Sequence, residues 1–143
     1  MSEQRWLIAA AGEWPNPVIW RPLAEAAYHI IAVDGGADEL ALNKVAATVV
    51  IGDLDSADSD VIACHPGARV IEVCEQVNSD LVKALDWCGE AGASEVDVIG
   101  VAGGRTDHML GTFAALLEAP AELAVKLHFE DCTATLLGPD AII

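Results

Sequence analysis

The sequence has few positive charges and no long apolar segment. Seven Lys and Arg stand against 23 Asp and Glu among 143 residues, a formal net charge of −16. This excess argues against nucleic acid or an anionic membrane as a partner, because both are themselves negatively charged. The apolar runs are all shorter than the roughly 20 residues that a membrane-spanning helix needs. The charge suits a site for a divalent metal or a small cation, or else an acidic surface that only keeps the protein soluble.

Paired cysteines and familiar catalytic motifs are missing too. The four cysteines form no C-x-x-C pair, so we expect reduced thiols in the core rather than a zinc site or disulfides. The apolar stretch WLIAAAG is too short for a secretory signal and follows Glu3, which predicts a cytoplasmic protein. G-x-x-x-x-G-K-[ST], G-x-G-x-x-G, H-E-x-x-H and G-x-S-x-G do not occur.

What the sequence does contain is an alternation of short β-rich runs and helical patterns. The runs are nearly all apolar, which is typical of strands buried on both faces of a parallel sheet. We therefore predict an α/β domain with a doubly wound, mostly parallel sheet and helices on both faces, a Rossmann-like three-layer arrangement. The predicted strands are residues 5–12, 29–34, 47–53, 68–73, 95–103 and 122–129, and the predicted helices are 17–28, 36–43, 58–64, 79–91 and 106–118.

A boundary follows the last of these strands. Residues 130–143 contain a strand-like run and a Gly-Pro turn with no helix after them. We expect residues 1–129 to form the α/β domain and residues 130–143 to begin a β domain that this sequence does not complete. An unpaired strand there would favour pairing between chains, so we expect self-association, most simply as a symmetric dimer.

Polar residues follow directly on several predicted strands. The carboxyl ends of parallel strands line one edge of an open sheet, and ligands bind in the crevice at that edge. We therefore expect these side chains to converge on one crevice. They are Asp34, Asp53, Asp55, Glu75, Asp80, Arg105, Asp107 and His108.

Two of these acids alternate around one residue. In an extended backbone Asp53 and Asp55 would point to the same side. Carboxylates held close together repel unless a cation or a proton lies between them. Mg²⁺ takes one or two carboxylates together with substrate phosphates, which fits this pair. The alternative is a solvated acidic loop in which Ser56 or Asp58 caps a helix.

The stretch VAGGRTDHMLG combines two glycines with an arginine at a helix start. Gly103 and Gly104 allow the backbone to approach a ligand, and the helix N-terminus presents free N–H groups to an anion. Arg105 adds a planar charged fork suited to phosphate oxygens. The alternative is a polar helix face with Asp107 as a cap. We expect Met109, Phe113, Leu116 and Leu117 to form the buried face, with Asp107, His108, Gly111 and Thr112 opposite.

Two further stretches have a local structural explanation when each is taken alone: it is favoured over function for AVDGGAD and equals function for NSDLVKAL. In AVDGGAD the glycines fit a tight turn in which Asp34 caps the next helix. In NSDLVKAL, Asn78 or Ser79 fits a helix cap, Asp80 favours the helix dipole, and Lys83 would face solvent.

Taken together, these stretches make the sequence resemble the thiamine pyrophosphokinases. The motifs are DGGA (34–37), GDLDS (52–56), SDLVKAL (79–85) and GGRTDH (103–108), in the family's order within residues 6–137. Each motif alone is weakly specific, and the four in order are quite specific.

The resemblance implies that a pyrophosphoryl group passes from ATP to the hydroxyl of thiamine, leaving thiamine diphosphate and AMP. It implies Mg²⁺ as the metal, ATP as the co-substrate and a homodimer. It gives catalytic roles to Asp34, Asp53, Asp55 and Asp80, the last three as metal ligands. The further nucleotide contacts that we expect are Gly35, Gly36, Ser56, Ser79, Lys83, Gly104, Arg105, Asp107 and His108.

The sequence departs from the family at two places. Many relatives have an acid at the position of Val77, so one metal or nucleotide contact is expected to be missing. Relatives also continue into a C-terminal β-sandwich that helps to hold thiamine, whereas this sequence ends at Ile143, so we expect poor thiamine turnover from it alone. Two other hypotheses remain: a pyrophosphokinase acting on another hydroxymethyl heterocycle such as a pterin, and a nucleotide-binding domain without catalysis.

Overall fold

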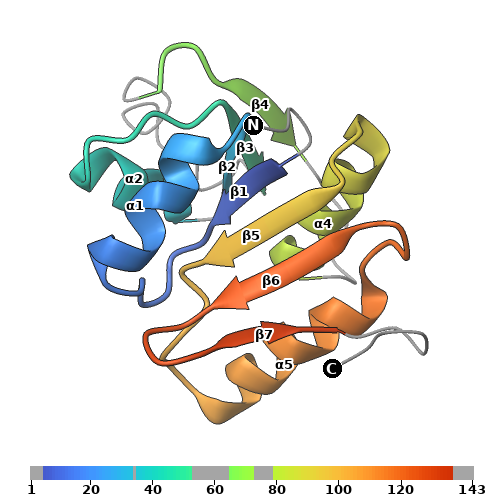
Figure 1. The fold of residues 1–143 in the computed structure, drawn as a ribbon. Helices are drawn as coiled ribbons and strands as arrows, with labels where there is room; N and C mark the ends of the chain where they lie inside the picture. The colour runs from blue at the N-terminus through green and yellow to red at the C-terminus, as the bar shows by residue number, and fades with distance from the viewer. Residues whose placement is uncertain (1–4, 34, 53–64, 73–78, 137–143) are drawn as a thin grey trace.

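A computed structural model describes residues 5–33, 35–52, 65–72 and 79–136 of the chain. One seven-stranded sheet runs through them in the order β4-β3-β2-β1-β5-β6-β7 (Figure 1). All neighbouring strands are parallel except β7, which is antiparallel to β6. The strands are β1 (Arg5–Ala9), β2 (Ile30–Val33), β3 (Val49–Gly52), β4 (Arg69–Glu72), β5 (Glu95–Ile99), β6 (Ala124–His128) and β7 (Thr133–Thr135); the helices are α1 (Pro17–Ala26), α2 (Gly36–Leu42), α4 (Asp80–Ala91) and α5 (Thr106–Glu118).

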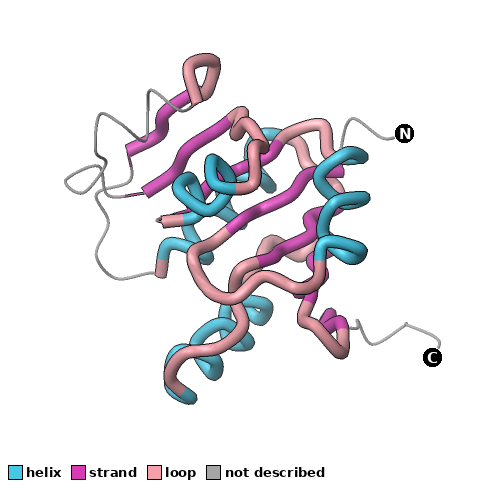
Figure 2. The backbone as a smooth tube through the Cα atoms, turned by 90° about the vertical axis from the view of Figure 1, so that its left-hand side faces the viewer, coloured by secondary structure: helices cyan, strands magenta, loops and turns pink. Residues whose placement is uncertain are grey.

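Helices cover the sheet on both faces, as Figures 1 and 2 show. Trp20 of α1 and Leu40 of α2 pack on one face, where they meet Leu7 of β1. Leu85 of α4 and Leu116 of α5 pack on the opposite face, around Ile8. The predicted α/β fold class is confirmed. The predicted helix at 58–64 lies outside the described residues.

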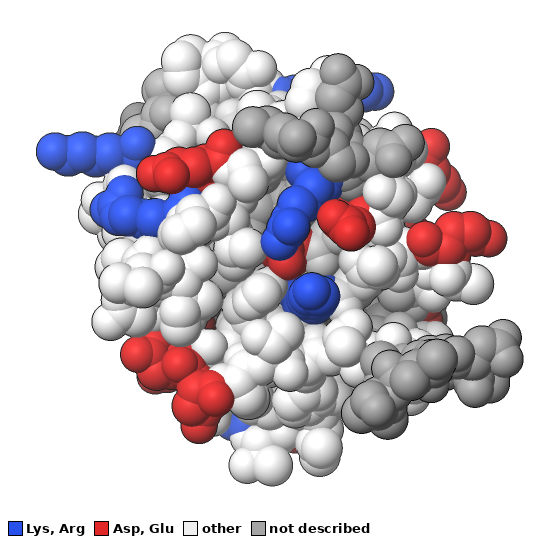
Figure 3. Space-filling model, viewed as in Figure 1, with Lys and Arg blue, Asp and Glu red and all other residues white. Residues whose placement is uncertain are grey.

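At its β6–β7 end, only one face of the sheet is covered by helices. Along β6, Val125 and Leu127 are buried, whereas Ala124 and Lys126 are exposed. Figure 1 shows no helix in front of β5, β6 and β7 on the side of α1 and α2, and in Figure 3 basic and acidic side chains lie next to one another on this side of the molecule. Buried and exposed side chains therefore alternate along β6, whereas β2 and β3 contain no polar side chain.

Helix α5 has the predicted bounds, and its buried face agrees with the prediction at Leu116 and Met109 but not at Phe113 and Leu117. Thr112, Ala115 and Leu116 are buried, whereas Phe113 and Leu117 are exposed. Small side chains let the helix lie close to the sheet, and the Thr112 hydroxyl is satisfied because it donates to the carbonyl of His108 at 3.1 Å. The larger apolar side chains are left at the surface, which explains why a hydrophobicity pattern misplaces this face.

The strand predicted to begin another domain pairs with the same sheet. Thr133–Thr135 forms β7 and bonds to β6, with Ala134 opposite Leu127. The expectation of an unpaired strand is therefore wrong for these three residues. No strand of the described chain pairs with the outer edge of β7. The predicted division between residues 1–129 and 130–143 stays a prediction.

The prediction of reduced cysteine thiols in the core is confirmed for Cys88. Cys88 on α4 is a buried free thiol, and burial raises its pKa to about 12, which keeps it protonated and unreactive. Cys132 is exposed, and Cys64 and Cys74 lie outside the described residues. None of the helices in the described segments is long and apolar enough to cross a membrane.

The chain order creates one switch point in the sheet. From β1 the chain proceeds through β2 and β3 to β4 on one side, and α4 then carries it back to β5 on the other side of β1. The loops that leave the carboxyl ends of β1 and β5 therefore diverge. A crevice at such a point is where doubly wound sheets bind ligands.

Candidate functional site

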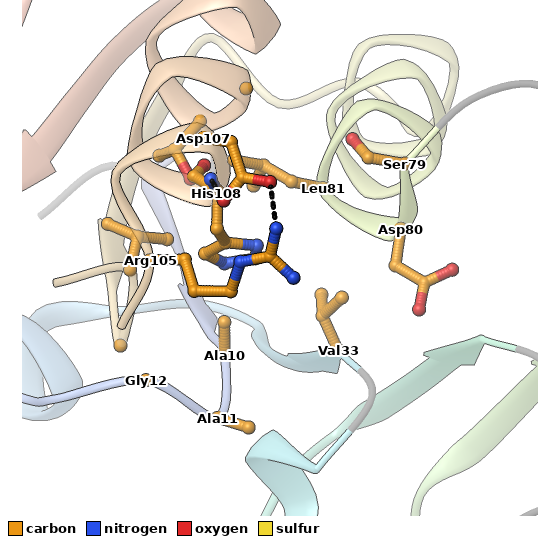
Figure 4. Close-up of a pocket in the computed structure, with 14 residues that line it drawn as sticks. Ala10, Ala11, Gly12, Val33, Ser79, Asp80, Leu81, Arg105, Asp107 and His108 are labelled. Carbon is orange, nitrogen blue, oxygen red and sulfur yellow. Dashed lines mark hydrogen bonds and ion pairs between the residues drawn. The ribbon is translucent and has the colours of Figure 1, made fainter. Parts of the chain in front are cut away.

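A pocket of about 560 Å³ lies at this switch point. We call it the switch-point pocket. Its volume falls in the range of small-molecule sites, roughly 300–1,000 Å³. It is lined from the loop after β1, the end of β2, the start of α4 and the segment from β5 into α5 (Figure 4). The lining residues are Ala10, Ala11, Gly12, Val33, Ser79, Asp80, Leu81, Gly100, Val101, Arg105, Asp107, His108, Gly111 and Thr112.

Glycines bring the two diverging loops into direct backbone contact. The N–H of Gly12 donates to the carbonyl of Gly100 at 2.6 Å. Gly100 has φ +83°, and a β-carbon on it would overlap the carbonyl of Ala10. Gly103 and Gly104 follow with φ of 76° and 77°, which disfavours any side chain there. The pocket wall is therefore largely backbone and small side chains.

Arg105 immediately precedes α5 and lies over the pocket (Figure 4). Its Nη2 donates to Oδ2 of Asp107 at 2.8 Å, and Oδ1 of Asp107 accepts from the N–H of His108 at 2.9 Å. An ion pair this exposed adds little to stability. It does hold the guanidinium at the start of α5, where the other N–H groups of Arg105 have no partner among the described residues.

The second polar wall of the pocket is the start of α4. Ser79 caps this helix, because its Oγ accepts from the N–H of Val82 at 3.3 Å. Asp80 follows in the first turn and lines the pocket. Its Oδ1 lies 3.7 Å from Nζ of Lys83, whose side chain is only 7 % exposed. The alternative in which Lys83 faces solvent is therefore wrong, and its ammonium group is buried beside a single described carboxylate.

Several predicted site residues do not line this pocket. A β-carbon on Gly36 would overlap the carbonyl of Ala9, and one on Gly35 would lie 3.0 Å from the β-carbon of Ala11. These glycines let the start of α2 pack closely on the end of β1, which is a different reason from the predicted tight turn with Asp34 as a cap. Gly104 lines a neighbouring hollow. The pocket does bring together Ser79, Asp80, Arg105, Asp107 and His108.

The remaining predictions fall on residues outside the described ranges. These are Asp34, Asp53, Asp55, Ser56, Glu75 and Val77. Within the described ranges, no three His, Cys, Asp or Glu side chains are arranged to hold a metal ion. Asp80 nevertheless offers carboxylate oxygens at the pocket, the donor type that Mg²⁺ prefers. The predicted metal site is compatible with this residue and stays a prediction.

Sequence reasoning missed the smaller lining residues. Ala10, Ala11 and Gly12 form one wall, Val33 ends β2 in the pocket, and Thr112 lines it from α5. The run AAAG directly after a strand was the available signal, since small residues there leave room for a ligand.

The arrangement favours an anionic ligand. The N-termini of α4 and α5 both border the pocket, and each presents unpaired N–H groups and the positive end of a helix dipole. Arg105 adds a permanent positive charge in a protein that has few. The pocket can therefore hold phosphate groups, with Asp80 placed to bind a cation that accompanies them.

Comparison with known proteins agrees with the resemblance. The family described as "Thiamin pyrophosphokinase, catalytic domain" matches residues 20–128. Thiamine pyrophosphokinase from Bacillus subtilis is similar at 25% identity and a TM-score of 0.70, over 87% of this chain and 60% of its own. The Geobacillus thermodenitrificans enzyme is similar at 25% identity and a TM-score of 0.68, over 87% of this chain and 59% of its own.

Yeast thiamin pyrophosphokinase shares the fold at a TM-score of 0.71 and 14% identity, over 90% of this chain and 59% of its own. No curated protein sequence matches the chain. The chain thus spans about 60% of the length of the Bacillus subtilis relative. With the family match covering more than half of it, the chain belongs to the thiamin pyrophosphokinase catalytic-domain family.

Proposed function

We propose that this chain supplies the catalytic α/β domain for the Mg²⁺-dependent transfer of pyrophosphate from ATP to the hydroxyl of thiamine, giving thiamine diphosphate and AMP. The observation that carries the proposal is the switch-point pocket, where two helix N-termini, Arg105 and Asp80 surround one space. The relatives from Bacillus subtilis and Geobacillus thermodenitrificans are thiamine pyrophosphokinases.

In this reaction the thiamine hydroxyl oxygen attacks the β-phosphorus of ATP and gives up its proton to solvent or a base. The bond from that phosphorus to the α–β bridging oxygen breaks, and AMP leaves with the bridging oxygen. Such a transfer depends on the positioning of the attacking hydroxyl next to the phosphorus and on neutralisation of the negative charge of the phosphates. We assign the binding of phosphate oxygens to Arg105 and the free N–H groups of α5. Asp80, with Asp53 and Asp55, would hold Mg²⁺, which neutralises phosphate charge when bound. Asp34 remains a further catalytic candidate.

Product analysis tests the proposal even if turnover is slow. The chain is mixed with ATP, Mg²⁺ and thiamine at protein concentrations above the substrate, and phosphorus NMR follows the products. We expect AMP and thiamine diphosphate in equal amounts, formed only when thiamine is present. ADP with thiamine monophosphate would contradict pyrophosphate transfer. ATP binding without thiamine-dependent consumption would instead indicate a nucleotide-binding domain.

Arg105→Lys is expected to weaken ATP binding about ten-fold, because a charged hydrogen bond contributes about 1.5–3 kcal/mol and an ammonium does not reproduce the guanidinium fork. His108→Gln is expected to do less. Calorimetric titration with ATP and Mg²⁺ measures both, and Arg69→Lys on exposed β4 is the matched control. An Arg105→Lys variant that binds like the wild type would make Arg105 a simple surface charge.

We also propose a cytoplasmic homodimer. Its support is the outer edge of β7, with which no described strand pairs, and an apolar stripe on α5, where Leu110, Phe113 and Leu117 are exposed at helical spacing. Sedimentation of the 143-residue chain should show a dimer, and Leu117→Glu should shift it toward a monomer that is still folded by circular dichroism. A monodisperse monomer at high concentration would contradict this arrangement.

A further inference from the structure

His65 is a buried histidine outside the site described above. It lies in the connection before β4 and is only 2% exposed. It belongs to none of the four motifs and does not line the switch-point pocket. A buried imidazole needs hydrogen-bond partners, because its ring nitrogens have lost their contact with water. Each ring nitrogen of His65 has one partner, and the two partners belong to different parts of the chain.

The two hydrogen bonds fix the position of the ring proton. The N–H of Ala47 donates to Nδ1 of His65 at 2.9 Å, so Nδ1 carries no proton. The carbonyl of Ala37 lies 2.9 Å from Nε2, and a carbonyl only accepts, so Nε2 carries the proton and donates the hydrogen bond. His65 is therefore a neutral imidazole in a single tautomer.

Both partners of the imidazole are buried as well. Ala37 is 1% exposed and Ala47 is 4% exposed. No other group of the described chain accepts the N–H of Ala47, so loss of the imidazole would leave a buried donor unpaired. Ala37 lies in the first turn of α2, and Ala47 lies just before β3. The imidazole thus ties the start of α2 to the chain that enters β3.

The start of α2 supports one wall of the switch-point pocket. Gly36 packs so closely on the end of β1 that a β-carbon on it would overlap the carbonyl of Ala9. A β-carbon on Gly35 would lie 3.0 Å from the β-carbon of Ala11. Ala11 lines the switch-point pocket together with Ala10. Because protein interiors are close-packed, a displacement at the start of α2 reaches this wall through direct contacts.

We propose that His65 is a positioning residue of the switch-point pocket. Its neutral imidazole holds the first turn of α2 against β1 and thereby fixes the pocket wall at residues 10–12. His65 touches no ligand and acts only through α2. A wall that is already ordered lowers the cost of binding a ligand. Only the identity of that ligand, ATP, rests on the proposed function.

Nitrogen-15 NMR of the histidine rings tests the assignment on the wild-type chain. The His65 signals are identified by their absence from His65→Gln. We expect Nε2 to be protonated and Nδ1 to be unprotonated at neutral pH, with slow exchange of the Nε2 proton with solvent. A proton on Nδ1, on its own or together with one on Nε2, would overturn the proposal.

Removal of the imidazole tests its link to the pocket. In His65→Ala without ATP, the amide of Ala47 should exchange about ten-fold faster, the scale of one lost hydrogen bond, and the amide shifts of residues 10–12 should move. The affinity for ATP with Mg²⁺ should fall about five-fold, and free imidazole should partly restore it. Asp97→Ala is the control, because it removes another buried side chain that lies outside the pocket lining. It should leave the shifts of residues 10–12 and the affinity for ATP unchanged.

The shifts of residues 10–12 decide the outcome independently of ATP. If they are unchanged in His65→Ala, or change equally in Asp97→Ala, His65 has no positioning role. If they move only in His65→Ala while the wild-type chain does not bind ATP, the positioning role stands and the proposed function fails. Should His65→Ala not fold, His65→Gln keeps a polar side chain in the site and should give the same changes at smaller size.

Discussion

Asp80→Asn is expected to weaken the binding of ATP with Mg²⁺ about 30-fold, because a charged contact of about 2 kcal/mol is lost. Asp80 lies in the first turn of α4 and lines the switch-point pocket, so its carboxylate is placed to meet a metal held by phosphates. Without Mg²⁺ the same substitution should have little effect or slightly favour ATP, because it removes a negative charge. Calorimetric titration with and without the metal separates the two cases.

Controls for this prediction come from the same helix and from the predicted metal ligands. Asp86→Asn, also on α4 but outside the pocket lining, should bind ATP like the wild type. Asp53→Asn and Asp55→Asn should each lower the metal-dependent affinity while the protein stays folded. If wild-type chain binds ATP equally well with and without Mg²⁺, the metal assignment is wrong.

Asp97→Ala is expected to lower the free energy of unfolding by about 3 kcal/mol, with a fall in melting temperature of roughly 10 °C. Asp97 lies on β5 and is 4% exposed. Its Oδ2 accepts from Nε of Arg5 at 3.0 Å, and its Oδ1 lies 2.8 Å from Nε2 of His128. Removing the carboxylate leaves His128, whose side chain is mostly buried, and the partly exposed Arg5 without this partner. ATP binding should not change, because Asp97 does not line the switch-point pocket.

This cluster also makes stability depend on pH. Burial alone would raise the pKa of Asp97, but the hydrogen bonds from His128 and Arg5 and their charges outweigh it and hold the pKa below its ordinary value. A carboxyl group with a lowered pKa stabilises the fold above its unfolded pKa of about 4, and this contribution is lost as pH falls through the folded value. Urea unfolding at pH 7 and pH 3 should therefore show a smaller difference between wild type and Asp97→Asn at pH 3. A difference that stays the same at both pH values would contradict this origin.

The sequence predicted the elements well because their periodicity is strong. Near-continuous apolar runs mark β1, β2 and β3, and α5 begins and ends where its pattern does. It was harder to predict which side chains of an element are buried and which are exposed. Thr112 is buried although it is polar, because its hydroxyl bonds to its own helix, and Leu117 is exposed although it is apolar. Both outcomes depend on how α5 sits against the sheet.

The site was predictable where strand order alone decides position. The switch-point pocket collects Asp80 and Arg105 because both follow carboxyl ends of parallel strands. The positions of the other predicted site residues depend on tertiary packing. Gly36 serves the contact between α2 and β1, and Lys83 lies buried, which a motif cannot show. Trp14 is held by a hydrogen bond from its Nε1 to the carbonyl of Ala10, a contact that spacing does not reveal.

The most direct test of the account is where ATP binds on this chain. Amide chemical shifts of the nitrogen-15-labelled protein are followed while ATP and Mg²⁺ are added. The account predicts saturable changes that are largest at residues 10–12, 79–81 and 105–112. The largest changes at residues remote from the switch-point pocket, or no saturable change at all, would contradict it.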